Sequence, residues 1–398
     1  MSCAPVTGKI LLAGGGYADI PMIASLKEMG FRVYTTGNRP DELGHKYADE
    51  YIPADFSDPE AVLDICKTLK VDGVCPCCND FSALSAAYAA EKLNLPGHDS
   101  VETLTRLMHK DSFRALARQF DLPVPGWRTI EADAPTLAEP GLKYPLIVKP
   151  VDLTGGKGMS VVNRFSELPA AIALAARRSR SSRIVVEEYL EYDDFHHNCV
   201  LFISDGRVVF HNSDNEHYYK NKFLVWGMSV PATTPDRIEK QVVEACRLLC
   251  SELRLKDGIM IMQYCVHNGE LRITECGRRM PGNLHGRLVE LATGFDISRQ
   301  TVKAFLGMPV SGLTQREVRG FWAENCVMAD REGQVASFEL SDKVKAALVE
   351  EIILAGPGFV VEDHLLDKLA ILLMRFNSFD EMIETSETMN EHVVINWS

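Results

Sequence analysis

The sequence has no apolar run of about 18 residues, the length that a membrane-spanning helix requires. It also has no excess of positive charge. Lysine and arginine number 42 against 55 aspartates and glutamates, which gives a formal net charge of −13. Nucleic-acid-binding proteins usually present a basic face, so this balance disfavours that class. We therefore expect a protein that binds neither membrane nor nucleic acid.

Organised cysteine pairs are also missing, although the chain has eleven cysteines. Their odd number and wide dispersal are typical of a reducing compartment, and a cytoplasmic location is expected. Within the run Cys75–Cys78, Cys75-Pro-Cys77 does not have the two-residue spacing of a redox pair, and no second cysteine pair lies near, so we expect small buried residues at a strand end. Residues 1–16 hold one lysine and a short apolar run that ends in glycines, which predicts a first strand rather than a signal peptide.

Two nucleotide-binding motifs are incomplete. Gly14 and Gly16 follow a predicted strand, but the third glycine of the dinucleotide fingerprint is absent, and the next strand ends without a carboxylate for a ribose. An NAD(P) site is therefore a weak alternative, and we expect a tight turn that exposes its amides to an anionic substrate. Farther along, Lys157 is followed by glycine rather than by Ser or Thr, which excludes a Walker loop.

Strands and helices alternate over residues 1 to about 100, which predicts a parallel sheet with helices on both faces. One helix is expected over Val101–Asp121. A β-hairpin is expected around Asp205-Gly206, whereas the polar and aromatic stretch Asp214–Ser229 is expected to be irregular. Residues 311–398 mix short strands and helices. The predicted fold class is thus α/β followed by α+β.

A glycine-rich turn between two predicted strands, Gly155–Gly158, forms a flap whose amides can fold over phosphates. Lys149 ends the preceding apolar strand, where a lysine is costly to bury without an anionic partner. Together they favour a polyphosphate ligand, and an ordinary glycine-rich hairpin is the alternative. Glu187 and Glu188 end another apolar strand. Such a strand end can meet an adenine edge and a ribose, and a solvated acidic linker is the alternative.

A predicted β-hairpin carries two oxygen donors, Gln263 and Glu275, with Arg279 just beyond it. If Asn268-Gly269 forms a two-residue turn, Gln263 faces Thr274 and the two donors lie on opposite faces. A three-residue loop or a β-bulge returns them to one face, so a shared Mg²⁺ site requires one of these. Two donors suffice because Mg²⁺ keeps waters and substrate phosphates. The arginine suits a phosphate or a developing anion, and a surface hairpin is the alternative.

Taken in order, these motifs resemble the ATP-grasp superfamily over roughly residues 5–310. The matches are an α/β pre-domain, the lysine helix and LPVP within His109–Trp127, YPLIVKP with the flap, VVEEYLE, and a hairpin ending in E-x-x-x-R. The hairpin is most similar to carbamoyl-phosphate synthase large-chain domains, which also carry Gln at the first metal position. LVELATGFD (Leu288–Asp296) resembles the same family and the ATP-grasp amino-acid ligases.

The resemblance implies four parts. A pre-ATP-grasp parallel α/β domain spans 1–105, a small lobe with the flap 106–183, a large lobe with the metal hairpin 184–310, and a small α+β domain 311–398. It implies that ATP is contacted by Lys110, Lys149, Gly155, Gly156, Gly158, Glu187, Glu188, Leu190 and Asp194. The two lysines would bind the phosphates. It further implies Mg²⁺ or Mn²⁺ at Gln263 and Glu275, and stabilisation of the transition state by Arg279.

The implied activity is that of an ADP-forming ligase, which converts a carboxylate into an acyl phosphate and joins it to an amine. The implied partners are a small carboxylate and an amine, such as an amino acid, and a homodimer is compatible with the resemblance. A carbamoyl-phosphate-synthase-like phosphorylating unit and a degenerate ATP-binding regulatory protein are the alternatives. Gly277 departs from the family, which usually has Asn two residues after the second metal ligand. Asn283 or water is a candidate replacement.

Overall fold

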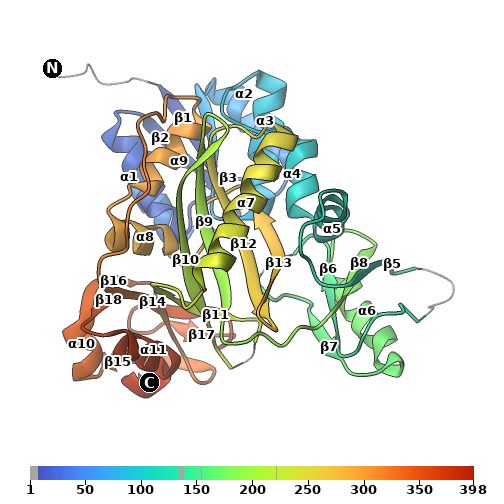
Figure 1. Ribbon diagram of the computed structural model, residues 1–398. Coiled ribbons are helices and arrows are strands. Elements are labelled where there is room, and N and C mark those ends of the chain that lie inside the picture. The colour runs from blue at the N-terminus through green and yellow to red at the C-terminus, as the bar shows by residue number, and fades with distance from the viewer. Residues whose placement is uncertain (1–7, 134–138, 154, 221) are drawn as a thin grey trace.

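Four parallel strands form the N-terminal sheet in a computed structural model that describes residues 8–133, 139–153, 155–220 and 222–398. Their order is β3-β2-β1-β4, with bounds β1 (Lys9–Ala13), β2 (Arg32–Gly37), β3 (Glu50–Pro53) and β4 (Gly73–Pro76). The first three helices are α1 (Ile20–Glu28), α2 (Pro59–Leu69) and α3 (Asp80–Leu93). Ile10 and Leu12 of β1 pack with α1, whereas Leu11 and Ala13 pack with α2 and α3. The predicted parallel sheet with helices on both faces is confirmed (Figure 1).

The single helix expected over 101–121 is wrong, since two helices occupy it: α4 (Val101–Met108) and α5 (Lys110–Gln119). His109 between them has an extended backbone, with φ −76° and ψ 126°. The amide of Lys110 donates to the carbonyl of Val151 at 3.1 Å instead of continuing the helix. The break therefore fixes the start of α5 against the strand that precedes the flap.

The small lobe is an antiparallel sheet covered by one helix, and it projects at the right of Figure 1. Its strand order is β5-β8-β6-β7, and Leu168 and Ile172 of the helix pack on the sheet. The elements are β5 (Trp127–Glu131), β6 (Leu146–Pro150), β7 (Ser160–Val162), α6 (Leu168–Arg178) and β8 (Arg183–Glu188). The flap residues thus connect β6 and β7, as the sequence predicted.

An eight-stranded sheet of order β13-β12-β9-β10-β11-β14-β18-β16 forms the centre of the molecule. The hairpin predicted around Asp205-Gly206 is confirmed. The irregular stretch expected at Asp214–Ser229 is wrong for its two ends, because β10 continues through buried polar residues to Tyr218 and β11 begins at Val225. Strands from 311–398 extend the large-lobe sheet. The bounds are β9 (His196–Ser204), β10 (Arg207–Tyr218), β11 (Val225–Val230), β12 (Gly258–His267), β13 (Glu270–Gly277), β14 (Phe321–Met328), β16 (Leu348–Ile353) and β18 (Lys368–Phe376).

The remaining helices cover this sheet or close the C-terminal part. Val242 and Leu249 of α7 pack on Leu201 and Met260, and α9 lies between the large sheet and β1. The elements are α7 (Asp236–Leu253), α8 (His285–Thr293), α9 (Ile297–Phe305), β15 (Gly333–Leu340), α10 (Asp342–Ala347), β17 (Val360–Val361), α11 (Phe379–Glu387) and β19 (Val393–Trp397). Short 3₁₀ turns add η1 (Tyr17–Asp19), η2 (Leu43–Tyr47), η3 (Phe165–Glu167) and η4 (Met389–His392).

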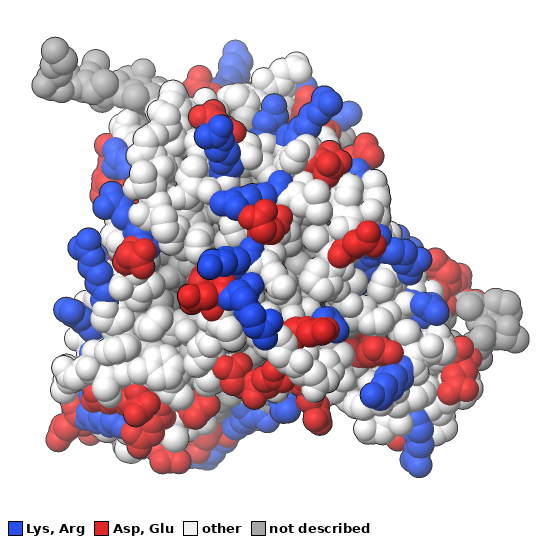
Figure 2. Space-filling model, viewed as in Figure 1, with Lys and Arg blue, Asp and Glu red and all other residues white. Residues whose placement is uncertain are grey.

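The surface and the cysteines agree with the composition. On the face seen in Figure 2, basic and acidic side chains are interspersed rather than gathered into a basic stripe. Within the described ranges, no helix is long and apolar enough to cross a bilayer. Cys75 and Cys77 are buried at the end of β4, as predicted, and burial raises the pKa of both thiols. The parallel sheet, the antiparallel sheets and their helices confirm the predicted mixture of α/β and α+β structure.

Candidate active site

A cleft that is partly open to solvent lies between the small-lobe sheet and the central sheet. Many of the sequence-predicted residues line it: Lys149, Gly155, Gly156, Glu187, Glu188, Leu190, Gln263 and Glu275. The sequence therefore identified residues on four separate strands and on the flap, and the fold brings all of them to one cavity.

Lys149 reaches the cleft from the inner strand of the small lobe and is held by a buried carboxylate. Its Nζ lies 2.9 Å from Oε2 of Glu187, and Arg114 Nε lies 2.7 Å from Oε1 of the same group. Burial would raise the pKa of Glu187, but the two cations outweigh it and hold the pKa at about 2. The side chain of Glu187 thus fixes the lysine, and its neighbours Glu188, Tyr189 and Leu190 line the cleft.

The glycine flap closes one side of the cleft. Gly155 and Gly156 have φ of +65° and +72°, a conformation that side chains other than glycine rarely adopt. A Cβ on Gly156 would lie 2.7 Å from both Cβ and the carbonyl oxygen of Phe223, whereas one on Gly155 would meet nothing within 4 Å. The flap is thus in close backbone contact with the loop between β10 and β11.

Gln263 and Glu275 lie opposite each other on the β12–β13 hairpin. The strands pair Gln263 with Glu275 and Tyr264 with Ile273, so Thr274 is the extra residue of a β-bulge. The turn at Asn268-Gly269 has two residues, because His267 pairs with Glu270. The sequence required either a three-residue loop or a β-bulge, and the structure has the bulge. The two oxygen donors therefore share a face.

Glu216 holds Gln263 from β10, two strands away from β12 in the sheet, and sequence reasoning missed it. Its Oε1 accepts a hydrogen bond of 2.6 Å from Gln263 Nε2, and its Oε2 accepts from Tyr218 at 2.7 Å and lies 2.9 Å from His196 Nδ1. Burial would raise the pKa of Glu216, but His196 and these hydrogen bonds lower it to about 2. An ionised carboxylate only accepts, so it fixes the amide group of Gln263 and leaves its carbonyl oxygen for a ligand.

Lys110 and Arg279 lie at the far side of the hairpin. Lys110 Nζ lies 3.2 Å from Glu275 Oε1 and donates to the carbonyl of Leu153 at 2.5 Å. Arg279 donates from Nε to Asp80 at 2.5 Å, at the first turn of α3. Asp80 and Lys110 line one small crevice. Neither Lys110 nor Arg279 lines the main cleft itself. Lys110 reaches it through Glu275, whereas Arg279 is held by Asp80.

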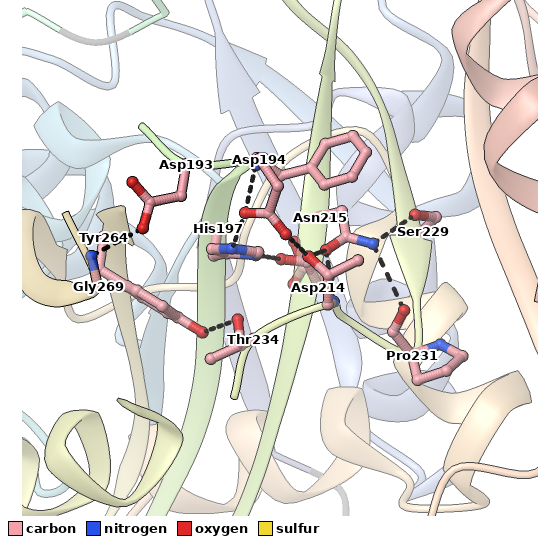
Figure 3. Close-up of polar contacts among 12 residues, drawn as sticks. Asp193, Asp194, His197, Asp214, Asn215, Ser229, Pro231, Thr234, Tyr264 and Gly269 are labelled. Carbon is pink, nitrogen blue, oxygen red and sulfur yellow. Dashed lines mark hydrogen bonds and ion pairs between the residues drawn. The ribbon is translucent and has the colours of Figure 1, made fainter. Parts of the chain in front are cut away.

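Asp194 is not brought to the cleft. Its carboxylate bonds to Thr233 and lies 3.5 Å from His197 Nε2 (Figure 3). Burial raises its pKa, yet the hydrogen bonds from His197 and Thr233 outweigh this and lower the pKa to about 2. Asp193 instead accepts from the amides of Asn268 and Gly269, which caps the hairpin turn. Gly158 also lies outside the cleft lining, where its site for a Cβ faces Pro150.

The first glycine turn differs from expectation. We expected Gly14–Gly16 to expose amides to an anionic substrate, but the amide of Gly16 donates to Asp19 at 2.9 Å. The other oxygen of Asp19 accepts from the amide of Cys78 at 2.9 Å. The turn therefore binds a carboxylate of its own chain, and it links β1 to the end of β4.

The departure at Gly277 has a steric counterpart. A Cβ there would lie 3.0 Å and 3.1 Å from Cγ1 and Cδ1 of Ile261, its partner across the hairpin. Asn283, the candidate replacement, accepts hydrogen bonds from Tyr17 and Lys368. Ile261 thus fills the place of a longer side chain at 277, and Asn283 is engaged elsewhere.

Comparisons with known proteins agree with this geometry. Residues 115–283 match the family model of the ATP-grasp domain. The N-terminal section of the carbamoyl phosphate synthase large chain from Methanopyrus kandleri is 24% identical over 333 residues, 75% of this chain and 57% of that protein. Formate-dependent phosphoribosylglycinamide formyltransferase from Prochlorococcus marinus is 22% identical over 360 residues, 88% of each chain.

Among solved structures, an L-amino acid ligase from Bacillus licheniformis has a TM-score of 0.79 at 18% identity and covers 100% of both chains. The chain carries an ATP-grasp domain, and the resemblance that the motifs indicated is confirmed. It spans little more than half of the length of the carbamoyl phosphate synthase section but most of the formyltransferase.

Proposed function

We propose that the chain is an ATP- and Mg²⁺-dependent ligase that activates a carboxylate as an acyl phosphate and joins it to an amine. The observation that carries the proposal is the shared face of Gln263 and Glu275, next to Lys149 and under the glycine flap. The similarity to a carbamoyl phosphate synthase section, a formate-dependent formyltransferase and an L-amino acid ligase supports the same class. The proposed substrates are small molecules.

The proposed reaction has two balanced steps. A carboxylate oxygen attacks the γ-phosphorus of ATP, the bond to the β-phosphate oxygen breaks, and ADP leaves. An amine nitrogen then attacks the acyl carbon, the bond to the phosphate oxygen breaks, and inorganic phosphate leaves while the amine loses a proton. The chain's part is positioning and charge neutralisation: Lys149 and Lys110 hold phosphates, and the flap excludes water.

The donor chemistry of the cleft fits Mg²⁺ or Mn²⁺. One amide oxygen and one carboxylate face the same cavity, and both are hard oxygen ligands of the kind that Mg²⁺ uses together with substrate phosphates. When bound, the ion would neutralise charge on the phosphates of ATP. Gln263, oriented by Glu216, and Glu275, adjacent to Lys110, would hold it.

A trapping assay tests the proposal. The chain is incubated with MgATP, pooled amino acids and other small carboxylic acids, and hydroxylamine in place of the unknown amine. We expect ADP and a hydroxamate in equal amounts, and no product with Glu275→Ala. ATP binding without ADP formation for every carboxylate would favour the regulatory alternative, to which the filled position at Gly277 also points.

We also propose a homodimer in a cytoplasmic setting, as expected for the family. Light scattering after size-exclusion chromatography tests the first part. A mass near 88.6 kDa, about twice the 44.3 kDa of one chain, supports the dimer, and a mass of 44.3 kDa contradicts it.

A further inference from the structure

A second polar site lies outside the nucleotide cleft, where three distant parts of the chain meet. Lys368, at the start of β18, donates to Tyr17 of the first glycine turn at 3.0 Å and to Asn283 before α8. Tyr17 in turn donates to Asn283 Oδ1 at 2.9 Å. Glu324 of β14 lies within the electrostatic range of Lys368 and Tyr17. The proposed phosphoryl-transfer steps use none of these four groups.

The cation in this site contacts neutral groups. Within the described parts of the chain, Lys368 forms no ion pair within 4.0 Å of a carboxylate, and its partners are a phenol, an amide oxygen and the thiol of Cys326. An ammonium has three donors, and an asparagine amide has two more on its nitrogen. A half-buried lysine with neutral partners favours a further anion, because unpaired buried charge is costly.

The buried carboxyl group in this site lacks a hydrogen-bond donor. Glu324 is 0% exposed, and its Oε2 has no hydrogen-bond partner among the described residues. Its Oε1 accepts only a weak contact of 3.7 Å from Cys326 Sγ. Burial raises the pKa of Glu324 well above its usual range. A buried carboxyl oxygen of this kind favours a hydrogen-bond donor, and most strongly a cationic one.

Strained backbone supports a functional reading of the same place. Asn283 and Leu284 have φ of +55° and +63°, two consecutive non-glycine residues in the left-handed region. Such residues cost on the order of 1–3 kcal/mol each and cluster at ligand-binding sites. Here the strained pair places the Asn283 side chain against Lys368 and Tyr17.

The site shares a face with the nucleotide cleft. Glu216, which lines the cleft, pairs with Met228, and Met228 pairs with Glu324, so the three lie in one cross-strand row. Paired residues point to the same side of a sheet, and adjacent strands lie about 4.8 Å apart, so Glu324 is roughly 10 Å from Glu216. This separation is within the length of a small substrate.

We propose that Lys368, Asn283 and Glu324 bind the α-amino-acid head group of a substrate, whose reacting group lies at its other end. The α-carboxylate binds the ammonium of Lys368 and the amide nitrogen of Asn283, and the α-ammonium binds Glu324. A pure anion would leave Glu324 without a donor, and a pure cation would be repelled by Lys368, so the pair matches a zwitterion. An amino-acid side chain of roughly 5 Å, with hydrogen bonds at each end, spans the interval to the cleft.

The reaction of the bound amino acid rests on the proposed ligase function, but the binding of its head group does not. The test therefore begins with the nucleotide-free protein and records its thermal midpoint with each of the twenty amino acids. Every amino acid that raises the midpoint is repeated as its N-acetyl form and as its α-methyl ester. We expect stabilisation by at least one free amino acid and its loss on blocking either group. Equal stabilisation by a blocked form, stabilisation by a phosphomonoester alone, or no stabilisation by any amino acid would overturn the proposal.

Two isosteric variants then locate the site, Lys368→Met and Glu324→Gln. We expect each to weaken amino-acid binding roughly ten-fold or more, because a buried polar group in the site loses its partner, while the Kd for MgATP changes less than two-fold. The matched controls are Lys343→Met and Glu384→Gln, which make the same changes at an ion pair on the surface of the C-terminal part. Unchanged amino-acid affinity in both site variants would overturn the assignment. If a variant fails to fold, the ligand panel on the unaltered protein still decides the question.

The two proposals fail in different ways. Amino-acid stabilisation without ADP formation supports the head-group site and contradicts the ligase. If a carboxylate that has no free α-amino group supports ADP formation at the full rate, the result supports the ligase and contradicts the head-group site.

Discussion

Gln263 lies directly opposite Glu275 because Thr274 bulges out of β13. Without that extra residue the two donors would face opposite sides of the hairpin. The bulge is therefore the local feature on which a shared metal site depends. Glu216 completes it, since its carboxylate accepts from Gln263 Nε2 at 2.6 Å and so orients the amide.

The first prediction concerns that hydrogen bond. Gln263→Glu replaces the donor with a second carboxylate against Glu216, and we expect the free energy of unfolding to fall by about 1–3 kcal/mol at neutral pH. Mg²⁺ with ATP should raise the thermal midpoint of this variant more than that of the wild type, because a cation between the carboxylates relieves the repulsion. Gln334→Glu is the control, because Gln334 is an exposed residue of β15. A variant as stable as wild type without metal would contradict the orientation assigned to Gln263.

The second prediction concerns the flap. Gly155→Ala and Gly156→Ala share a left-handed backbone, so both incur similar conformational strain. Only the second adds a Cβ that would meet Phe223 at 2.7 Å. We expect KM for ATP to rise several-fold more in Gly156→Ala than in Gly155→Ala, since the flap must move to accept the methyl group. Steady-state kinetics at saturating second substrate measure this, and equal effects would mean that contact with Phe223 does not matter for ATP binding.

The third prediction concerns Gly277 and Ile261. Gly277→Asn alone should lose about 1–3 kcal/mol of stability through overpacking against the isoleucine. Combined with Ile261→Ala, the asparagine should fit, so the double variant should be more stable than the sum of the single changes. We also expect the double variant to reach half-maximal activity at lower Mg²⁺. Additive stabilities in urea unfolding would show that Ile261 does not limit the position.

The fourth prediction concerns acid. The pKa of Glu187 is about 2, against an ordinary 4.5, so its charge stabilises the fold fully above pH 4.5. That contribution is lost as the pH falls from 4.5 toward 2. Glu187→Gln should lower the free energy of unfolding at pH 7 by about 3 kcal/mol, because Arg114 and Lys149 lose their partner. The difference from wild type should shrink below pH 4.5.

Urea unfolding at pH 7 and pH 3 gives the comparison. Glu384→Gln removes one carboxylate of an exposed pair and should change stability by less than about 1 kcal/mol at either pH. A deficit in Glu187→Gln that stays constant between the two pH values would mean that the carboxylate is not ionised in the folded protein.

The sequence predicted the parts of the site that follow local rules. Lys149 and the flap stood out because a lysine ends an apolar strand and glycines follow it. The hairpin donors stood out through the strand pattern, which also showed that a bulge or an odd loop was needed. Glu216 could not be found in this way, because the polar run of β10 resembles a loop, and only pairing with β9 and β11 buries it.

Long-range contacts account for the other differences. Tyr17 and Lys368 are 351 residues apart in the sequence, yet they form a hydrogen bond. No local pattern indicates this contact. Asp194 follows β8 closely enough to suggest a ribose contact, yet His197 and Thr233 hold its carboxylate outside the cleft. The helix break at His109 likewise depends on a partner outside the helix, the carbonyl of Val151.

The central claim is that a carboxylate oxygen attacks ATP, and isotope transfer tests it most directly. A carboxylate substrate found in the trapping assay is labelled with ¹⁸O in its carboxyl group and turned over with unlabelled MgATP and an amine. The account predicts one ¹⁸O atom in the inorganic phosphate, because the oxygen that attacks phosphorus leaves with it. Phosphate that carries no ¹⁸O from the carboxylate, and that takes up oxygen only from labelled water, would contradict it.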